Sequence, residues 1–364
     1  MNSPNASPSA TATVTVTPIK KNYARPLDLK HGHIDMSHGG GGRAMVQLIG
    51  DLFARHLGNE LLAQGNDGTV LPAGPGRWVV STDSHVVSPL FFPGGDIGGL
   101  SVHGTVNDVA MMGATPLYLT AGFILEEGFP LADLARIVES MAQAALAAGV
   151  KLVAGDTKVV EKGKGDGLFI TTTGMGFLAE GIHLSGDLAR PGDVILLSGS
   201  VGDHGMAIMS KRENLSFDAP ILSDSAALNG LTAAMLASGA AIRVMRDPTR
   251  GGLAATINEI ARQSGVGFHL EEAAIPVKPE VEAACELLGL DPLNIANEGK
   301  LIAVCAAEDA AHLLAVMRAH PLGQDAALIG KVVEDDNAFV QMKTRFGGRR
   351  MVDWLSGEQL PRIC

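Results

Sequence analysis

The sequence predicts two mixed α/β domains followed by a flexible C-terminal tail. Segments with the apolar spacing of strands alternate with segments that have the 3.6-residue spacing of helices. The length of 364 residues suits two domains, each with its own core. Aromatic residues make up only 4% of the chain, and Ala, Val, Leu and Ile dominate the apolar residues. Such a core favours helices packed on sheets over a base-stacking surface.

The chain divides into four parts by composition and pattern. They are a leader (1–33), a first domain (34–186), a second domain (187–345) and a tail (346–364). The leader is rich in Ser, Thr, Asn, Pro and Ala and has little apolar patterning, so we expect disorder there. The domain boundary is placed in a loop-like stretch just before an apolar strand segment.

The expected elements follow in chain order. Helical spacing begins near Ala44 and stops at Gly58, and a helix that Pro130 opens is ended by Gly149. The other elements expected in the first domain are a strand at 77–83, a helix at 98–112 and strands at 151–154 and 168–178. Those expected in the second domain are a strand at 193–197 and helices at about 252–263, 279–288 and 308–319.

Charge and hydropathy exclude several classes of protein. A net charge of -11 and a pI near 5.4 disfavour nucleic-acid binding, which relies on basic patches. No apolar run approaches the roughly 20 residues that cross a bilayer, and the N-terminus lacks the apolar region of a signal peptide. We therefore expect a cytoplasmic protein with no membrane or nucleic-acid partner.

The three cysteines indicate neither a disulfide framework nor a zinc site, since none lies in a Cys-x-x-Cys unit. Cys285 and Cys305 lie in apolar segments and are expected to be unreactive core residues. Cys364 is the last residue, and an adjacent terminal carboxylate would raise the pKa of its thiol. Its reactivity would then come from a site that the tail visits, within about 60 Å of Phe346. The alternative is a terminal cysteine that occurs by chance.

Four consecutive glycines, Gly39, Gly40, Gly41 and Gly42, run directly into the first helical segment. Glycine amides are unobstructed and a helix N-terminus favours anions, so this run suits a phosphate. It matches neither the Walker A nor the dinucleotide-binding spacing, and a flexible hinge is the alternative interpretation.

Three aspartates stand at strand ends or beside turn residues, and a fourth, Asp108, lies in a helical stretch. They are Asp83, Asp108 after Asn107, Asp156 before Thr157 and Lys158, and Asp247 before a proline. Carboxylates in such places suit Mg²⁺ and polyphosphate sites. Each one alone can equally be a turn former or a helix cap, so the hypothesis depends on their convergence.

Three further residues are candidates for the same site. Lys158 could contact a phosphate, or it could be a surface lysine. Glu298 would suit a general base if burial raises its pKa, and otherwise it is a solvated turn residue. His85 follows Asp83 by two residues and could join it, whereas most other histidines are expected to be structural or solvated.

An ordered series of motifs runs from about Ile34 to the last residue. It comprises His38-Gly-Gly-Gly-Gly, Thr82-Asp83, Ser88-Pro-Leu-Phe-Phe-Pro-Gly-Gly95, Asn107-Asp108, Gly122-Phe-Ile-Leu-Glu-Glu127, Gly155-Asp-Thr-Lys-Val-Val160, Gly202-Asp-His-Gly205, Asp247-Pro-Thr-Arg-Gly-Gly252, Asn297-Glu-Gly-Lys300, His320-Pro-Leu-Gly323 and Pro361-Arg-Ile-Cys364. The series resembles the HypE family of hydrogenase maturation proteins, the carbamoyl dehydratases. The Pro-Arg-Ile-Cys ending separates that family from its relatives.

The resemblance extends to the PurM-like superfamily of aminoimidazole ribonucleotide synthetase and selenophosphate synthetase. It implies an N-terminal α/β domain whose sheet mediates homodimerisation, a C-terminal α/β domain folded over it, and ATP in a cleft. The implied site has Mg²⁺ at Asp83, Asp108 and Asp247, ATP near Asn107, Asp156 and Thr157, and the Gly39–Gly42 loop over the nucleotide.

The resemblance also implies a reaction at Cys364. A carbamoyltransferase, HypF, would place a carbamoyl group on the thiol, and ATP-dependent dehydration would turn this thiocarboxamide into a thiocyanate. The cyanide would pass to iron held by a HypC–HypD complex. Lys158 and Glu298 are the candidates for deprotonating and positioning the nitrogen.

Two rival functions are considered beside this one. A superfamily enzyme that phosphorylates a free small molecule, such as selenide or thiamine phosphate, would be indifferent to the loss of Cys364. A non-catalytic carrier would accept a group on Cys364 without consuming ATP. The terminal cysteine counts against the first rival, and the acidic residues count against the second.

Overall fold

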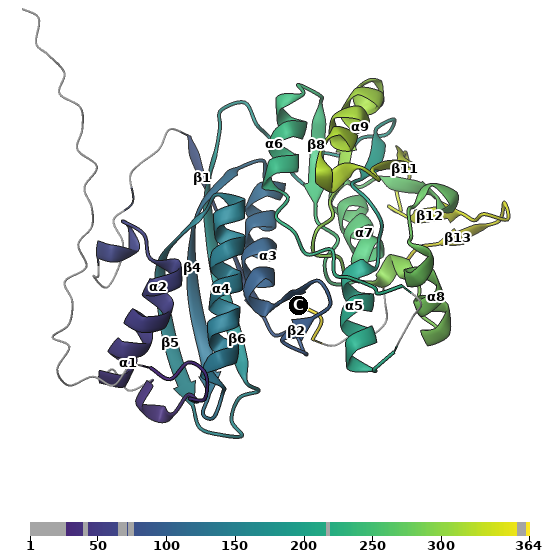
Figure 1. Ribbon diagram of the computed structural model, residues 1–364. Coiled ribbons are helices and arrows are strands. Elements are labelled where there is room, and N and C mark those ends of the chain that lie inside the picture. The colour runs from purple at the N-terminus through teal and green to yellow at the C-terminus, as the bar shows by residue number, and fades with distance from the viewer. Residues whose placement is uncertain (1–26, 39–42, 65–70, 72–75, 216–218, 355–361) are drawn as a thin grey trace, which may run out of the picture.

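The computed structural model describes residues 27–38, 43–64, 71, 76–215, 219–354 and 362–364. Two sheets lie side by side with helices packed on them, and the end of the chain lies between α3 (Ile97–Met111) and α5 (Asp203–Arg212) (Figure 1). The predicted class of two mixed α/β domains is confirmed. The predicted phosphate loop Gly39–Gly42 and most of the predicted leader lie outside the described residues.

The first sheet places Asp83 on its inner face. The strand order is β1 (Arg77–His85), β6 (Leu168–Leu178), β4 (Thr115–Glu126) and β5 (Lys151–Val160). β4 and β5 are parallel, and the other pairs are antiparallel. The register aligns Asp83 with Thr172, and Thr172 with Ala121. Because side chains alternate between the faces of a strand, this row of residues shares one face.

Helices cover that inner face. α3 packs on β1 and β6, and α4 (Leu131–Ala148) packs on α3 and β5. Asp96 caps α3 by accepting from the N–H groups of Gly98 and Gly99, and Gly149 ends α4 at a φ of 72°. α1 (Arg43–Leu48), a π-helical turn (Ile49–Phe53) and α2 (Ala54–Leu57) continue one another beside α4. A short hairpin of β2 (Phe91–Phe92) and β3 (Gly95–Asp96) precedes α3.

The outer face of the first sheet carries large apolar side chains that are exposed in the single chain. Val80, Trp78 and Ile124 are 62%, 44% and 44% exposed. The ring of Trp78 packs on that of Phe177 with centroids 4.0 Å apart. A sheet face with several exposed large apolar side chains is typical of an association surface.

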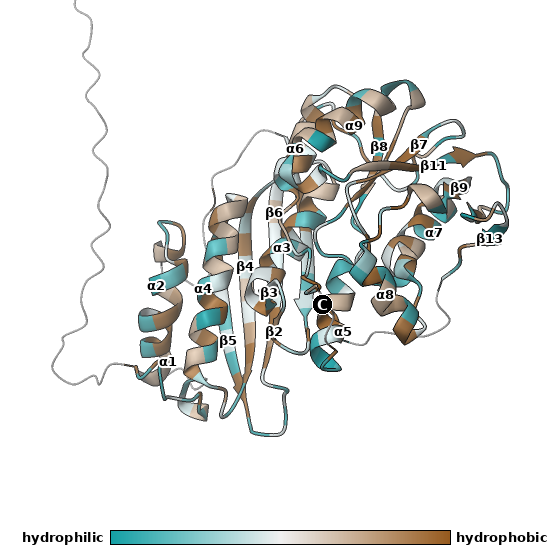
Figure 2. Ribbon diagram, turned by 45° about the vertical axis from the view of Figure 1, so that its right-hand side comes forward, coloured by the Kyte–Doolittle hydropathy of each residue, from teal (hydrophilic) through white to brown (hydrophobic). Residues whose placement is uncertain are grey.

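The second sheet has helices on both faces. Its strand order is β13 (Arg349–Met351), β12 (Val340–Lys343), β9 (Gly267–Glu271), β11 (Ala327–Val333), β7 (Val194–Leu197), β10 (Ile302–Cys305) and β8 (Ile242–Arg246). β7, β8 and β11 are largely hydrophobic (Figure 2). α7 (Gly252–Ser264) packs on one face, and α6 (Asn229–Ala237) and α9 (Ala310–Ala319) pack on the other. α8 (Pro279–Leu288) packs against α5.

The predicted elements are present, and three of the differences concern the extent of the sheets. β5 extends to Val160, well beyond the expected strand at 151–154. β4 was not predicted, because Pro116 and Gly122 interrupt its strand pattern. β13 lies within the predicted tail and pairs with β12, so the second sheet continues past residue 345. No helix of the described residues is long and apolar enough to span a membrane.

Candidate functional site

Three titratable side chains converge on Gly104 of α3. A Cβ at Gly104 would lie 3.1 Å from His85 Cε1, 3.4 Å from Asp83 Oδ2 and 3.9 Å from Glu298 Oε2. Glycine at this position therefore lets all three side chains approach the helix closely. Asp83 and His85 come from β1, whereas Glu298 comes from the loop before β10. The site accordingly lies where the two domains meet.

Asp108 and Asp247 lie at the same junction. Ser81 Oγ donates to Asp108 Oδ2 at 2.7 Å. A cavity of about 500 Å³ opens between β1, the C-terminal end of α3 and the loop before α7. Its polar lining residues are Ser81, Asp108, Arg246, Asp247, Thr249, Arg250, Thr256 and Glu259. The cavity thus combines carboxylates with arginines, as a site for a metal-bound polyphosphate requires.

These carboxyl groups are poorly neutralised by the protein. Burial, followed by the charge of Asp247, raises the pKa of Glu298 well above its ordinary value. Burial, followed by the charge of Asp108, raises the pKa of Asp247 to about 7. Glu298 Oε1 and Asp247 Oδ2 are buried without a hydrogen-bond partner. Because an unpartnered buried polar atom costs roughly 1–3 kcal/mol, this group indicates a ligand site rather than a stabilising cluster.

Mg²⁺ fits this site only together with a ligand. Among the residues that the structure describes, no three His, Cys, Asp or Glu side chains are placed to hold a metal ion. Asp83, Asp108 and Asp247 are therefore not arranged as a ready-made metal site, and their role as Mg²⁺ ligands stays a prediction. Mg²⁺ usually takes one or two carboxylates together with phosphate oxygens and water. The unpartnered Oδ2 of Asp247 suits that role.

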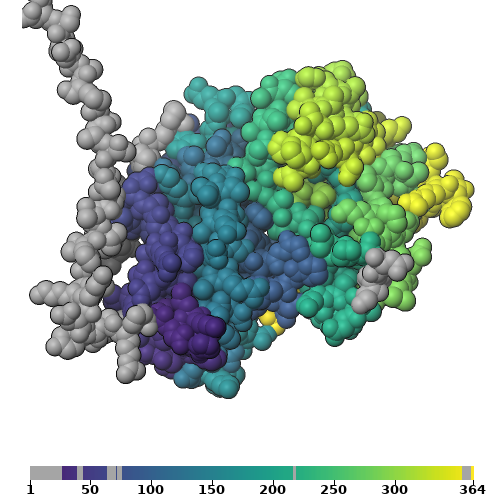
Figure 3. Space-filling model, viewed as in Figure 1, coloured from purple at the N-terminus to yellow at the C-terminus, as the bar shows by residue number. Residues whose placement is uncertain are grey.

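The end of the chain is bound beside these carboxylates. Val86 N donates to Cys364 O, and Ser88 N donates to Arg362 O, both at 3.1 Å. The tail thus pairs in antiparallel fashion with the segment that follows β1. Ile363 is only 3% exposed, and in Figure 3 only a small part of the chain end is visible between the two domains.

Two arginines hold the same three residues. Arg212 of α5 donates from Nη2 to Ser88 O at 2.6 Å and to Arg362 O at 2.9 Å. Arg362 donates from Nε to Val86 O at 3.0 Å and forms an ion pair with Asp166. These bonds tie the tail to both domains.

The thiol of Cys364 is protonated in this position. Burial is the main cause that raises its pKa, and the charges of Glu298 and Asp83 add to the effect, whereas Arg250 opposes it. The predicted direction of the pKa shift is confirmed, but its main cause is burial rather than a neighbouring terminal carboxylate.

Asn107 is engaged by the protein itself. Its Nδ2 donates to Ala226 O at 3.0 Å and Glu298 O at 3.3 Å, and its Oδ1 accepts from Leu228 N at 2.7 Å. Asn107 therefore joins α3 to the second domain, and the predicted contact with ATP stays a prediction.

Asp156 and Lys158 lie apart from the buried carboxylates. They are on β5, three strand spacings or about 14 Å from β1. The register places them beside Gly122 and Ile124 on the open outer face, whereas Asp83 faces α3. Their side chains are 63% and 64% exposed and form an ion pair at 2.6 Å. The expectation that Asp156 lies close to Asp83 does not hold within one chain, because the two residues point to opposite faces.

Thr157 points inward, next to a second cavity. It is buried and lies between Asp156 and Lys158 on β5. A cavity of about 390 Å³ opens there between β4, β5 and the helices α1 and α2. Its lining is mostly apolar and includes Met45, Ile49, Phe53, Phe123, Asp156 and Thr157. The predicted ATP-binding residues therefore fall at two separate places in one chain.

Residues without a predicted role also contact the site. His204 Nε2 lies 2.8 Å from Ile363 O. Asp224 accepts from Glu298 N at 3.1 Å and pairs with Lys300 at 3.0 Å. His204 belongs to the Gly202–Gly205 motif, so the sequence could have marked it as a candidate. Its contact with the tail could not be predicted, because the two residues are 159 apart in sequence.

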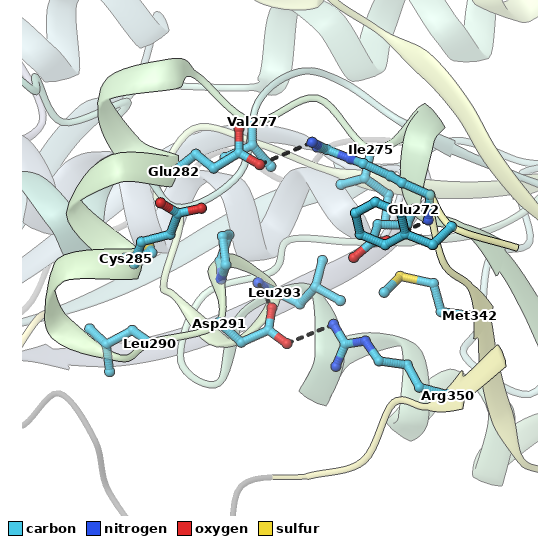
Figure 4. Close-up of a pocket in the computed structure, with 14 residues that line it drawn as sticks. Glu272, Ile275, Val277, Glu282, Cys285, Leu290, Asp291, Leu293, Met342 and Arg350 are labelled. Atoms are coloured by element: carbon cyan, nitrogen blue, oxygen red, sulfur yellow. Dashed lines mark hydrogen bonds and ion pairs between the residues drawn. The ribbon is translucent and has the colours of Figure 1, made fainter. Parts of the chain in front are cut away.

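A third cavity, of about 350 Å³, lies in the second domain away from these residues. It is bridged by the ion pairs Arg345–Glu282 and Arg350–Asp291 (Figure 4). Cys285 lines it, but burial raises the pKa of the Cys285 thiol to about 12. Burial likewise raises the pKa of Cys305 to about 12, and the prediction that both cysteines lie in the core is confirmed.

Family models match most of the chain. The N-terminal domain of AIR synthase related proteins matches residues 65–178, and the C-terminal domain of AIR synthase related proteins matches residues 190–343. The chain is 70% identical over 338 residues to the carbamoyl dehydratase HypE of Azotobacter vinelandii, covering 93% of this chain and 99% of that relative.

Solved structures are similar over most of their length. A crystal structure of the hydrogenase maturation protein HypE in complex with ATP is 52% identical, with a TM-score of 0.87, and the match covers 90% of this chain and 99% of that one. A crystal structure of a HypE–HypF complex contains a chain that is 52% identical, with a TM-score of 0.75, and the match covers 85% of this chain and 99% of that one.

Proposed function

The chain belongs to the HypE family of AIR synthase related proteins, the carbamoyl dehydratases, and from this membership we propose that it dehydrates a carbamoyl group on its own Cys364 in an ATP-dependent reaction. The product is a thiocyanate that supplies the cyanide ligands of [NiFe]-hydrogenase iron. The observation that carries the proposal is the position of the tail, which pairs with Val86 and Ser88 just after Asp83 and is buried at Ile363.

The proposed chemistry removes one water from the thiocarboxamide S–C(=O)–NH₂. The carbonyl oxygen bonds to the γ-phosphorus of ATP as the bond to ADP breaks. Loss of one N–H proton gives S–C(=NH)–O–PO₃. Loss of the second N–H proton and cleavage of the C–O bond release phosphate and leave S–C≡N. Phosphorylation is needed because it turns a poor leaving oxygen into a good one.

Glu298 is our candidate for accepting these protons. Its Oε1 is buried and has no hydrogen-bond partner, so it is available to a carboxamide N–H. Burial raises the pKa of this carboxyl group, so its ionised form is a stronger proton acceptor than a solvated carboxylate. The backbone of Glu298 is fixed by Asp224, which accepts from its N–H, and by Asn107, which donates to its carbonyl.

ATP is assigned to the cavity of about 500 Å³ beside Asp108 and Asp247. Support comes from the similarity to the HypE structure that contains ATP. Asp247, with Asp108 or Asp83, would hold Mg²⁺ together with the phosphates. The ion would neutralise charge on the transferring phosphoryl group. Arg250 lines the same cavity and presents further positive charge to the phosphates, whereas Arg246 is paired with Glu259 at 2.5 Å.

A homodimer through the open face of the first sheet would give Lys158 a role. Lys158 lies on that face, which also exposes Val80, Trp78 and Ile124. Within one chain it is separated from Cys364 by the sheet. We therefore expect Lys158 to act on the site of a second copy of this chain.

Two partners complete the proposal. HypF is proposed as the carbamoyltransferase that loads Cys364, on the basis of the similar chain in the HypE–HypF complex. A HypC–HypD complex is proposed as the acceptor of the cyanide. Both roles require Arg362–Cys364 to leave the docked position, since Ile363 is buried there.

Intact-protein mass spectrometry tests the function. The chain is incubated with the carbamoyltransferase and its substrates, with and without Mg-ATP. We expect a carbamoyl adduct on Cys364 that loses one water only when ATP is present, and no adduct on Cys364→Ser. An adduct that ATP does not change would favour the carrier, and the absence of an adduct would favour an enzyme that acts on a free small molecule.

A further inference from the structure

We propose that His204 is a positioning residue for the dehydration, because it holds the carbonyl of Ile363 and thereby fixes the Cys364 side chain relative to Glu298. The inference rests on the proposed function and adds a residue to it. His204 is the second residue of α5, so a rigid element of the second domain carries it.

The contact between His204 and the tail is fully buried. His204 has a relative exposure of 0% and Ile363 of 3%. His204 Nε2 lies 2.8 Å from Ile363 O. The ring packs edge-on against Phe92, with centroids 5.4 Å apart and planes at 88°. Packing and hydrogen bonding therefore both define the orientation of the imidazole.

The hydrogen-bond network selects one tautomer of His204. Burial lowers the pKa of His204, so the ring is neutral and carries one N–H. A carbonyl oxygen only accepts, so Nε2 must hold the proton. Nδ1 then accepts from the hydroxyl of Ser223 at 2.8 Å, and Ser223 Oγ in turn accepts from Ser225 N at 3.1 Å. Ser223 thus keeps the donating nitrogen directed at the tail.

His204 binds the carbonyl of Ile363, which takes no part in the backbone pairing of the tail. The carbonyls of Arg362 and Cys364 accept from Ser88 N and Val86 N. In an antiparallel pair the intervening carbonyl points to the other side. His204 donates to it there, so all three tail carbonyls are satisfied. Without this bond a buried carbonyl would lack a partner, and the docked tail would loosen.

The segment that orients His204 also holds Glu298. Between Ser223 and Ser225 lies Asp224, whose carboxylate accepts from Glu298 N at 3.1 Å and Gly299 N at 3.3 Å. Lys300 pairs with the same carboxylate at 3.0 Å and lies 13% exposed. Residues 223–225 therefore connect His204, which binds the tail, with the backbone of Glu298, the candidate base. Such shared support places two reacting groups in a fixed geometry.

Two substitutions of His204 in the full-length chain test the inference. His204→Leu keeps bulk but removes the donor, whereas His204→Gln retains an N–H near the position of Nε2. One measurement is the rate of water loss from the carbamoylated chain after addition of Mg-ATP. The other is the rate at which iodoacetamide alkylates Cys364 in the unloaded chain, read by peptide mass spectrometry.

For His204→Leu we expect dehydration to fall by about 10- to 100-fold, as small misplacements of reacting groups do. Alkylation of Cys364 should accelerate at least about tenfold because the tail spends more time undocked, and loading by the carbamoyltransferase should not slow. His204→Gln should recover much of both effects. His320→Gln is the matched control, since its ring accepts from Leu322 N far from the tail and neither rate should change.

Ser223→Ala keeps the proposal testable if His204→Leu fails to fold. This variant leaves the imidazole in place but removes the hydroxyl that selects its tautomer. We therefore expect slower dehydration and faster alkylation of Cys364, both to a smaller extent than in His204→Leu. Wild-type rates of dehydration and alkylation in His204→Leu, or in a folded Ser223→Ala, would overturn the inference. Failure of the proposed function would be seen differently, as a carbamoylated wild-type chain that does not lose water with ATP.

Discussion

The buried carboxylates at the domain junction and the exposed Asp156–Lys158 pair were expected to form one site, yet they are opposite in character. Asp247 Oδ2 and Glu298 Oε1 are buried and unpartnered, and the pKa values of both carboxyl groups are raised. Asp156 has a partner at 2.6 Å and a lowered pKa, for which Lys158 is the main cause. The first group is incomplete without a ligand, whereas the second is already satisfied.

The difference indicates that the buried carboxyl groups lower the stability of the empty protein and serve binding instead. An exposed ion pair contributes about 0–1 kcal/mol to stability and can be changed with little consequence. Buried carboxyl groups without partners destabilise the empty protein, and only a bound cation or donor compensates for them. Substitutions of the buried carboxyl groups are therefore expected to change activity and stability strongly. Substitutions of the exposed pair are expected to change stability little.

The largest expected effect is on activity at Glu298. Glu298→Gln removes the candidate base, so the rate of ATP-dependent water loss from carbamoylated Cys364 should fall by about 100-fold or more. The mass-spectrometric time course measures it. Glu286→Gln, on α8 next to the third cavity, is the control. Dehydration at the wild-type rate in Glu298→Gln would remove this residue from the mechanism.

A buried histidine beside the junction should contribute to the acid sensitivity of the fold. Burial lowers the pKa of His103 to about 4, from an ordinary value near 6.5. The unfolded chain therefore binds this proton at a higher pH than the folded protein does, and stability is lost as pH falls from about 6.5 to 4. We expect His103→Gln to remove up to about 3 kcal/mol of that loss.

Denaturant unfolding at pH 7 and pH 4.5 measures this difference. His31→Gln serves as the control because the side chain of His31 is 71% exposed. An equal loss of stability on acidification in wild type and His103→Gln would show that His103 does not control it.

The next effect is a gain of stability at Asp247. Asp247→Asn removes a buried carboxyl group from beside Asp108, so the nucleotide-free protein should become more stable by about 1–2 kcal/mol. The same variant should lose the stabilisation that Mg-ATP gives to the wild type. Thermal unfolding with and without Mg-ATP measures both. A less stable empty protein that still responds fully to Mg-ATP would contradict the assignment.

The smallest effect is expected at the exposed pair. Asp156→Asn should change the free energy of unfolding by less than about 1 kcal/mol, since both side chains are largely solvated. Lys158→Ala should likewise keep the fold, but it should slow dehydration in homodimers if a second copy supplies this lysine. Mixed dimers of Lys158→Ala and Glu298→Gln chains would then regain activity in one of their two sites.

Local patterns predicted much of the fold and part of the site. Strand–turn–helix spacing predicted the two α/β domains, and motif position brought attention to Asp83, Asp247, Glu298 and Cys364. These residues come together through contacts between distant segments, such as the hydrogen bond from Val86 N to Cys364 O. No local pattern reports such contacts.

The errors have a physical origin. A strand displays alternate residues on opposite faces, so the face on which Asp156 lies depends on strand order and register. Neither is visible in a single sequence. The use of Asn107 as a tie to Ala226 and Leu228 is likewise a property of the packed domains. The role of His204 was missed because its partner, Ile363, lies at the other end of the second half of the chain.

The central claim is that the carbamoyl oxygen on Cys364 is activated by direct transfer of a phosphoryl group. An ¹⁸O label placed in the carbamoyl group, followed by addition of Mg-ATP to the isolated loaded chain, tests it most directly. The account predicts that the label appears in inorganic phosphate, with one ADP formed for each water lost from the chain. Label found in solvent water, with phosphate unlabelled, would contradict it.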